Sequence, residues 1–187
     1  EAQFRVPDLA AAYEVLFRHY RYTYVEAGKC YPPKTETQDD PNRDITGHHY
    51  EDRLEQGFST IGDIFSKEKN PERKKQFDMR QVMNALIDSD AGYLERWRAM
   101  QDADTAIVWE TRMGGNAVGM IGIESRSIQR IGAVPADGPE SWSGGTLFPL
   151  SSKKVTRGIN AFSRRVPLTI IANLSGFDGS PEPLRYF

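Results

Sequence analysis

A glycine-containing bend near the C-terminal end is the segment of this sequence best suited to chemistry. Residues 167–173 have the apolar, β-favouring character of a short strand, and residues 180–182 read Ser-Pro-Glu, which are residue types that start a helix. Between them, Gly176 and Gly179 allow backbone N–H groups to approach a ligand closely. Such amides can stabilise an oxyanion, and ligands of α/β sheets usually lie beyond the C-terminal ends of strands. A plain strand-to-helix turn is the alternative that the pattern leaves open.

Other reactive residue types are not arranged for catalysis or metal binding. His48 and His49 are adjacent, a spacing that does not favour zinc, so we expect a loop there; we expect His19 to be structural. Cys30 is the only cysteine, so an intramolecular disulfide is impossible and a reducing, cytoplasmic compartment is expected. The sequence contains no glycine motif for nucleotide phosphates, so ATP chemistry is not encoded in it.

The composition narrows the class of protein. The 187 residues, 39% apolar and 27% charged, suffice for one globular domain or for one domain plus an arm. A formal net charge of −2 provides no basic field for nucleic acid or an anionic membrane, and no apolar run of about 18 residues occurs. The first residues lack both a signal-peptide pattern and an initiator methionine, so we expect the sequence to be a fragment.

The first half predicts one helix and a long connector. Apolar residues recur at helical spacing over residues 9–25, with Asp8 as a possible cap. We expect this stripe to pack in a core; an aromatic platform for bases or sugars is the alternative. Residues 28–76 are rich in turn-forming residues and predict a connector that wraps a larger body. Its apolar anchors are Phe58, Ile61, Ile64 and Phe65.

The second half predicts regular α/β structure. Helical stripes occupy residues 77–87 and 93–100, and residues 105–113 and 117–123 predict two strands joined by a tight hairpin turn at residues 114–116.

After a Gly/Pro-rich loop over residues 124–145, apolar spacing predicts a helix over residues 151–163. Residues 167–173 then predict a short buried strand. This strand–helix–strand order implies a parallel pair with a right-handed crossover.

Four blocks carry a resemblance to a known family. In order and spacing, they resemble the carboxyltransferase domain of acetyl-CoA carboxylase and related biotin-dependent acyl-CoA carboxylases. The blocks are residues 77–80, residues 112–126, residues 145–154 with 158–162, and residues 170–179. Residues 1–76 are similar to the segment that links the two halves of that domain.

The resemblance implies an α/β fold of the crotonase-like (ClpP/crotonase) type, a superhelix of strand–strand–helix units that is incomplete in this chain and carries a helical and loop-rich N-terminal arm. Residues 1–76 would be a helix plus an extended connector from the preceding subdomain. Residues 77–187 would be the first part of the C-terminal subdomain. The family site lies between the first half of one protomer and the second half of another, so a homo-oligomer is expected.

The implied reaction moves a carboxyl group from carboxybiotin to the α-carbon of acetyl-CoA or a related acyl-CoA. Negative charge then builds on the thioester oxygen and on the ureido oxygen of biotin, and preorganised amides can stabilise both. The implied cofactor is biotin on a carrier domain, and the coenzyme A thioester is the substrate. Biotin carboxyl carrier and biotin carboxylase domains or subunits are the implied partners, together with the other carboxyltransferase subdomain. No metal, nucleic acid or membrane is implied.

Three residues fall on the family's Gly-Phe loop beside biotin and are assigned to catalysis: Gly176, Phe177 and Gly179. Arg126 matches an arginine expected near the transferred carboxylate, for which a guanidinium fork is suited; a surface arginine paired to a neighbour is the alternative. Lys154 matches a lysine at the start of the crossover helix, where it would meet phosphate or be solvated. Ser175, included in the biotin-binding set, stands where eukaryotic acetyl-CoA carboxylases have an arginine.

Two parts of the family's electrostatic apparatus are expected to lie outside this sequence. They are a later glycine-rich loop that offers amides to biotin and the enolate-binding loop of the first subdomain. We therefore expect the 187 residues alone to be inactive. Two alternatives remain open: a non-catalytic truncated or assembly module of such a carboxylase, and another crotonase-type acyl-CoA enzyme such as a hydratase or decarboxylase.

Overall fold

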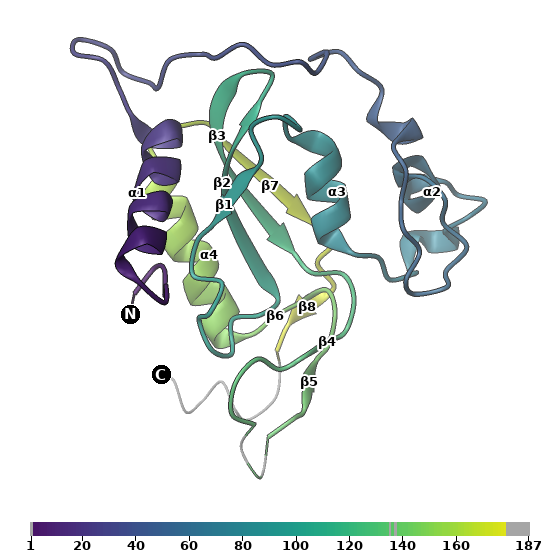
Figure 1. The fold of residues 1–187 in the computed structure, drawn as a ribbon. Coiled ribbons are helices and arrows are strands. Elements are labelled where there is room, and N and C mark those ends of the chain that lie inside the picture. Colours follow the sequence, from purple (N-terminus) through teal and green to yellow (C-terminus); the bar gives the residue numbers. More distant parts are fainter. Residues whose placement is uncertain (1, 135, 137, 179–187) are drawn as a thin grey trace.

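A four-stranded mixed sheet forms the centre of the protein (Figure 1). The computed structural model describes residues 2–134, 136 and 138–178. The strands lie in the order β1-β2-β3-β7. Their bounds are Tyr93–Glu95 for β1, Ala106–Met113 for β2, Asn116–Ile123 for β3 and Leu168–Ala172 for β7. β3 pairs antiparallel with β2 and parallel with β7, which confirms the predicted hairpin and the predicted parallel pair.

The hairpin turn depends on two glycines. Gly114 and Gly115 have φ values of 56° and 79°, the positive values that a two-residue turn needs at both positions. The buried Asp88 carboxylate accepts hydrogen bonds from both glycine N–H groups, at 2.8 and 2.7 Å. Met113 therefore pairs with Asn116 and sets the register of the whole hairpin.

Helices cover both faces of the sheet. A Cβ added to Gly119 would lie 2.2 Å from the Phe162 ring of α4 (Pro149–Phe162), and one added to Gly122 would lie 2.4 Å from Met83 of α3 (Met79–Leu86). Positions an odd number of residues apart on a strand face opposite sides, so the two helices lie on opposite faces of β3. The result is a helix–sheet–helix arrangement, compatible with a crotonase-like fold, which itself remains a prediction.

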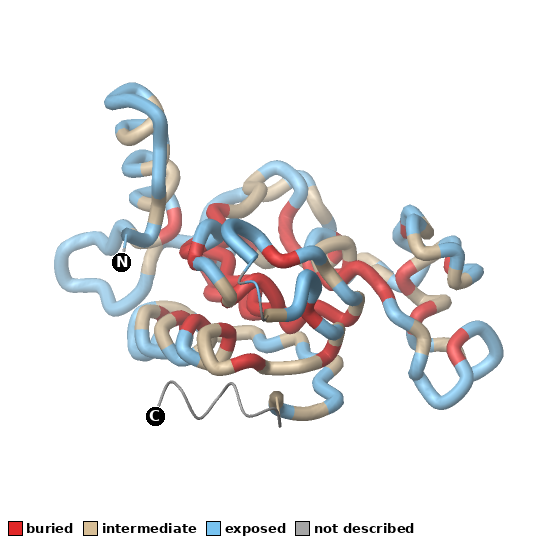
Figure 2. The backbone as a smooth tube through the Cα atoms, turned by 90° about the horizontal axis from the view of Figure 1, so that it is seen from below, coloured by how far each residue is buried: buried red, intermediate tan, exposed pale blue. Residues whose placement is uncertain are grey.

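The first helix is present, but its apolar stripe is not a core stripe. α1 (Leu9–Thr23) begins with the Asp8 side chain accepting a hydrogen bond from the Ala11 N–H, as predicted. The expected packing is wrong for every residue of the stripe: Leu9, Tyr13, Leu16, Phe17, Tyr20 and Tyr24 are 42–70% exposed. Only Tyr22 of α1 is buried, so the helix touches the body along its other side (Figure 2).

The predicted helix over residues 93–100 is wrong. Residues 93–95 form β1, and the Tyr93 ring stacks on Trp109 of β2 with a centroid distance of 3.7 Å. Positive φ values at Gly92 and Trp97, 61° and 53°, interrupt a right-handed helix on both sides. Cross-strand stacking thus overrides an apolar spacing that also fits a helix.

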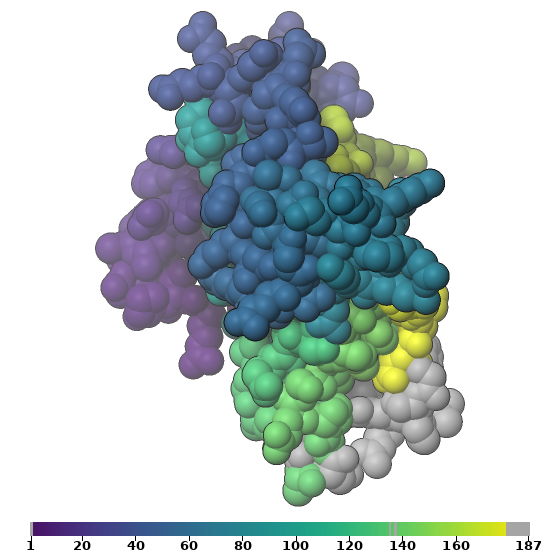
Figure 3. Space-filling model, turned by 90° about the vertical axis from the view of Figure 1, so that its right-hand side faces the viewer, coloured from purple at the N-terminus to yellow at the C-terminus, as the bar shows by residue number. Residues whose placement is uncertain are grey.

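The connector carries three short helical segments, at Ile45–Gly47, Ile61–Phe65 (α2) and Pro71–Arg73. Tyr50, Phe58, Ile61 and Ile64 pack in one core cluster with α3 and the sheet. Phe65 is 52% exposed and is not an anchor. Figure 3 shows this segment lying over α3 on one side of the molecule. The domain boundary at residue 76 stays a prediction.

Two pairs of short strands lie outside the central sheet. β4 (Ile128–Gln129) pairs with β5 (Ser141–Trp142), and β6 (Thr146–Leu147) pairs in parallel with β8 (Gly176–Phe177). The expectation that residues 167–173 are buried is wrong, because β7 is the edge strand and Ile170 is 51% exposed.

Candidate active site at the end of strands β3 and β7

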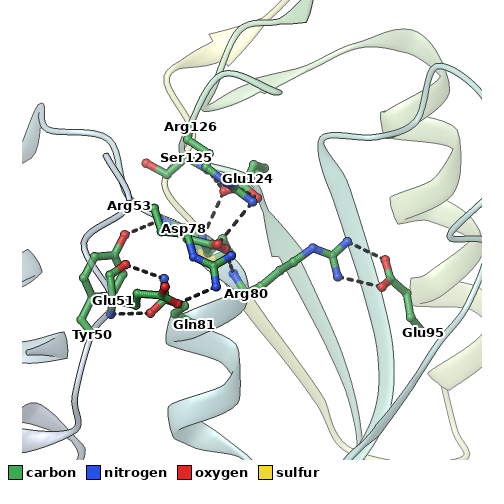
Figure 4. A network of polar contacts seen from close by, with 11 residues as sticks. Tyr50, Glu51, Arg53, Asp78, Arg80, Gln81, Glu95, Glu124, Ser125 and Arg126 are labelled. Atoms are coloured by element: carbon green, nitrogen blue, oxygen red, sulfur yellow. Dashed lines mark hydrogen bonds and ion pairs between the residues drawn. The ribbon is translucent and has the colours of Figure 1, made fainter. Parts of the chain in front are cut away.

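Arg126 lies directly beyond the C-terminal end of β3, between two carboxylates (Figure 4). Its Nη2 is 3.2 Å from Asp78 Oδ2, and its Nε is 3.4 Å from Glu124 Oε2. Asp78 also caps α3 by accepting from the Arg80 N–H at 2.9 Å. The pairing that the sequence left open is therefore present, while 26% of the Arg126 side chain remains exposed.

Glu124 is buried and held by the backbone. Its Oε1 accepts from the N–H groups of Met79, at 3.1 Å, and Ser125, at 3.0 Å. Burial raises the pKa of the Glu124 carboxyl above its usual range, and the negative charge of Asp78 adds to the rise. This environment therefore favours the neutral form of Glu124 more than water does, while the nearby Arg126 favours the ionised form.

The ends of β3 and β7 are tied together. Asn173 Nδ2 donates to Ser125 Oγ at 2.8 Å, which holds the start of the Gly-Phe bend next to Arg126. The Gly145 N–H donates to Glu124 O at 2.7 Å and brings β6 to the same place. The structure thus brings Arg126 and Ser175–Phe177 to one end of the sheet, as the parallel pair requires.

The amides of the bend do not form the open cradle expected from the sequence. The N–H groups of Ser175 and Gly176 donate to Gly145 O, at 2.7 and 3.4 Å, and the Asp178 N–H donates to Leu147 O at 3.1 Å. This expectation is corrected because β8 adds to β6 as a second parallel strand, and that ladder uses these donors.

Phe177 and Gly176 leave the outer side of the bend open. The Phe177 side chain is 72% exposed, and a Cβ added to Gly176 would meet no atom within 4 Å. Gly179 and the predicted helix start at Ser180, Pro181 and Glu182 lie outside the described residues.

Lys154 is not solvated, contrary to one of its two expected environments. It is 1% exposed on α4. Burial lowers the pKa of Lys154 from 10.5 to about 8, against the negative charge of Glu95, which raises it. The assignment of Lys154 to substrate binding stays a prediction.

The ion pair between Arg80 and Glu95, near Lys154, was not predicted from the sequence. Arg80 donates to both oxygens of Glu95, each at 2.7 Å. Burial opposes the ionised form of Glu95, but the bidentate pair with Arg80 lowers the pKa of this carboxyl below its usual range. The available signal was the place of Arg80 in residues 77–80, one of the blocks that carry the resemblance.

A family model described as "Carboxyl transferase domain" matches residues 19–183. The chain belongs to this carboxyl transferase domain family. The candidate site lies within the residues that this family model matches, and its assignment as a site stays a prediction.

Relatives of this carboxyl transferase domain are acetyl-CoA carboxylases. It is 28% identical over 126 residues, 59% of the chain, to acetyl-CoA carboxylase dmxL1 of Cryptosporiopsis sp. (strain 8999). It is 38% identical over 92 residues, 44% of the chain, to acetyl-CoA carboxylase of Schizosaccharomyces pombe. It is 31% identical over 116 residues, 57% of the chain, to that of Dictyostelium discoideum. These matches cover 6%, 4% and 5% of the respective relatives.

Among residues 2–134, 136 and 138–178, no group of three or more His, Cys, Asp or Glu residues could hold a metal ion. No helix within those residues is long and apolar enough to cross a membrane.

Proposed function

We propose that this chain forms one wall of the carboxyltransferase site of a biotin-dependent acyl-CoA carboxylase. In this proposal a carboxyl group passes from carboxybiotin to acetyl-CoA or a related acyl-CoA. The observation that carries the proposal is the position of Arg126, fixed between Asp78 and Glu124 and adjoining the bend after β7. The family match and the acetyl-CoA carboxylase relatives support the reaction class.

Arg126 would orient the transferred carboxylate. Two carboxylates hold the planar guanidinium, which lowers the entropy cost of presenting its remaining N–H groups. The exposed quarter of the side chain is the part that would touch substrate.

The residues of the bend fit biotin through shape more than through hydrogen bonds. The exposed Phe177 ring and the open space over Gly176 suit an apolar, flat group. The N–H groups of Ser175 and Gly176 are engaged by Gly145, so they would not bind the ureido oxygen. Carboxybiotin, when bound, supplies the carboxyl group, and these residues would position it and exclude water.

The decisive experiment changes Arg126 in a carboxylase that contains both subdomains. Arg126→Ala is expected to lower kcat/KM for carboxyl transfer by about 100-fold, the usual loss of one preorganised charge contact. Arg126→Lys, which keeps the charge without the fork, is expected to recover only part of this loss. Arg53→Ala, which removes an exposed arginine nearby, should leave kcat/KM unchanged. An Arg126→Ala enzyme with normal kcat/KM would reject the proposed role.

A second candidate function is a non-catalytic assembly module of such a carboxylase. The observation that favours it is the row of exposed apolar side chains on α1, which suits docking on the other carboxyltransferase subdomain. The internally bonded amides of the bend also fit this alternative. Carboxyl transfer by the two-subdomain protein that depends on Arg126 would decide against it.

Biotin carboxyl carrier and biotin carboxylase partners, a homo-oligomer and a cytoplasmic location belong to the same proposal. The partners and the homo-oligomer are suggested by the family, whereas the cytoplasmic location rests on the single cysteine; some matched relatives are mitochondrial acetyl-CoA carboxylases. We also propose that the 187 residues alone do not transfer a carboxyl group, because they cover only 6% and 4% of the length of the first two relatives that they match.

A further inference from the structure

A second pocket lies at the opposite end of the sheet from Arg126. It opens where β7 begins, between α1, the C-terminal end of α4 and the first half of β3, and has a volume of about 200 Å³. We call it the basic pocket, and its basic and acidic lining residues are His19, Arg96, Glu110, Arg164 and Arg165. Val118 lines it five residues before the end of β3, whereas Arg126 follows that end.

The lining carries more positive than negative charge. Glu110 is the one carboxylate among its lining residues, and both of its oxygens are already used. Oε2 lies 2.6 Å from His19 Nδ1, and Oε1 accepts from Arg96 Nη1 at 3.2 Å. Neither Arg164 nor Arg165 makes a side-chain hydrogen bond or ion pair with another described residue. Their charges are therefore uncompensated at the pocket.

Arg96 gives the pocket a buried polar group with unused capacity. Its side chain is 8% exposed, and its Nε has no hydrogen-bond partner among the described residues. The guanidinium lies 4.7 Å from the Trp97 ring centroid and 5.8 Å from that of Phe162, which fixes its plane. Burial lowers the pKa of Arg96 against the raising effect of Glu110, and the positive charge of Arg165 lowers it further.

The backbone presents two of these arginines at a sharp turn. α4 ends at Phe162, and Arg164 then has φ +63°, an uncommon value for a residue with a side chain. The Arg165 N–H bonds back to Phe162 O at 2.9 Å, which tightens the turn. Strained backbone of this kind is often kept where side chains must be held for a ligand.

Most of the other lining residues of the pocket are apolar. Val25, Pro32, Val118, Ala161, Phe162 and Val166 line it. We propose that the basic pocket binds a small carboxylate with an apolar body, whose carboxylate meets Arg164 and Arg165 and whose body lies against Phe162 and Val118. The site is separate from the carboxyltransferase wall proposed above and does not depend on it. Its volume sets the ligand below drug size.

Binding of 3-phenylpropionate to the 187-residue chain tests this site by isothermal titration calorimetry. Its neutral amide, 3-phenylpropionamide, has the same body without the charge, and inorganic phosphate has charge without the body. We expect the carboxylate to bind at least about tenfold more tightly than either comparison compound. Equal binding of the amide would overturn the role of the arginines, and equal binding of phosphate would overturn the role of the apolar lining.

Two substitutions locate the bound carboxylate. Arg165→Gln and Arg164→Gln, both at exposed positions, are each expected to weaken 3-phenylpropionate binding by about tenfold. Lys153→Gln removes an exposed charge from α4 away from the pocket and should leave binding unchanged. Unchanged binding in both arginine variants would reject the proposal.

Cys30 provides an independent readout, because this only cysteine of the chain is exposed and lines the basic pocket. Bound 3-phenylpropionate is expected to slow alkylation of Cys30 by iodoacetamide several-fold, in proportion to occupancy measured by calorimetry. The slowing should disappear in Arg165→Gln at the same ligand concentration. Binding that leaves the alkylation rate unchanged would place the ligand elsewhere and overturn the assignment.

Discussion

At the residue scale, Lys154 shows how burial changes the chemistry of one side chain. It belongs to α4, is 1% exposed and has its pKa lowered to about 8 by burial. The negative charge of Glu95 opposes this shift, but Arg80 already neutralises that carboxylate through a bidentate pair. The cost of a buried ammonium therefore remains largely uncompensated.

The unfolding free energy of the protein is expected to change with pH as Lys154 titrates. Between pH 8 and 10.5 the unfolded chain holds a proton that the folded chain has lost, so stability rises with pH in this window. From pH 7 to 9.5 the gain attributable to Lys154 is about 2 kcal/mol. Urea unfolding of wild type and of Lys154→Met at several pH values measures this gain. The difference between their unfolding free energies, plotted against pH, isolates the contribution of Lys154.

The matched control is Lys153→Met, at an exposed position of the same helix. Its unfolding free energy should follow that of wild type across the same pH range. If wild type and Lys154→Met keep a constant difference from pH 7 to 9.5, the lysine does not titrate in the folded state as burial requires.

At the element scale, β3 is the strand on which the neighbouring strands, the helices α3 and α4 and the candidate site are arranged. It pairs with β2 and β7, carries α3 and α4 on opposite faces, and is followed directly by the segment that contains Glu124 and Arg126. Two glycines allow both helices to approach the strand closely. Changes at these glycines should therefore act through the packing of whole helices.

Gly119→Ala is expected to destabilise the fold by about 1–3 kcal/mol, because a Cβ there would lie 2.2 Å from the Phe162 ring and α4 would have to shift. Gly47→Ala provides the comparison, since a Cβ at that position meets nothing within 4 Å. Chemical denaturation of both variants measures the difference in unfolding free energy. Equal stability of the two would mean that the Phe162 ring relaxes without moving the helix.

The elements that neighbouring residues in the sequence specify could be predicted. The elements that depend on contacts with distant segments of the chain were missed. The β2–β3 hairpin was predictable because its two glycines and alternating apolar residues are contiguous. β1 was missed because its choice of strand over helix is made by stacking on Trp109. For the site, Arg126 was predicted from the resemblance, but its partner Asp78 comes from the start of another element.

The bend after β7 shows the same limit. β6 and β8 are two-residue strands inside loops, and such short pairs leave no periodic signal. Their pairing uses backbone N–H groups that the Gly-Phe motif was expected to offer to a ligand. A motif can fix residue types at a site, whereas the free donors at that site depend on which segment lies alongside.

At the scale of the whole molecule, the protein presents an apolar face on α1. His19 and Tyr22 fasten the helix to the body: His19 bonds to Glu110, and Tyr22 Oη donates to Ala91 O at 2.7 Å. The opposite side displays a row of large apolar side chains, among them Leu16 and Phe17, which are 56% and 64% exposed. Contiguous apolar surface of this kind marks an interaction face in soluble proteins.

The exposed face is expected to make the 187-residue chain bind a hydrophobic dye and self-associate in sedimentation velocity. Phe17→Glu, made together with Leu16→Glu, should abolish dye binding and shift the sedimenting species toward monomer, with the helical circular dichroism signal retained. Glu14→Gln changes an exposed charge on the same helix without altering the apolar area and should behave as wild type. A wild-type chain that stays monomeric and binds no dye would show that α1 does not offer an interaction face, and the assembly role would lose its main support.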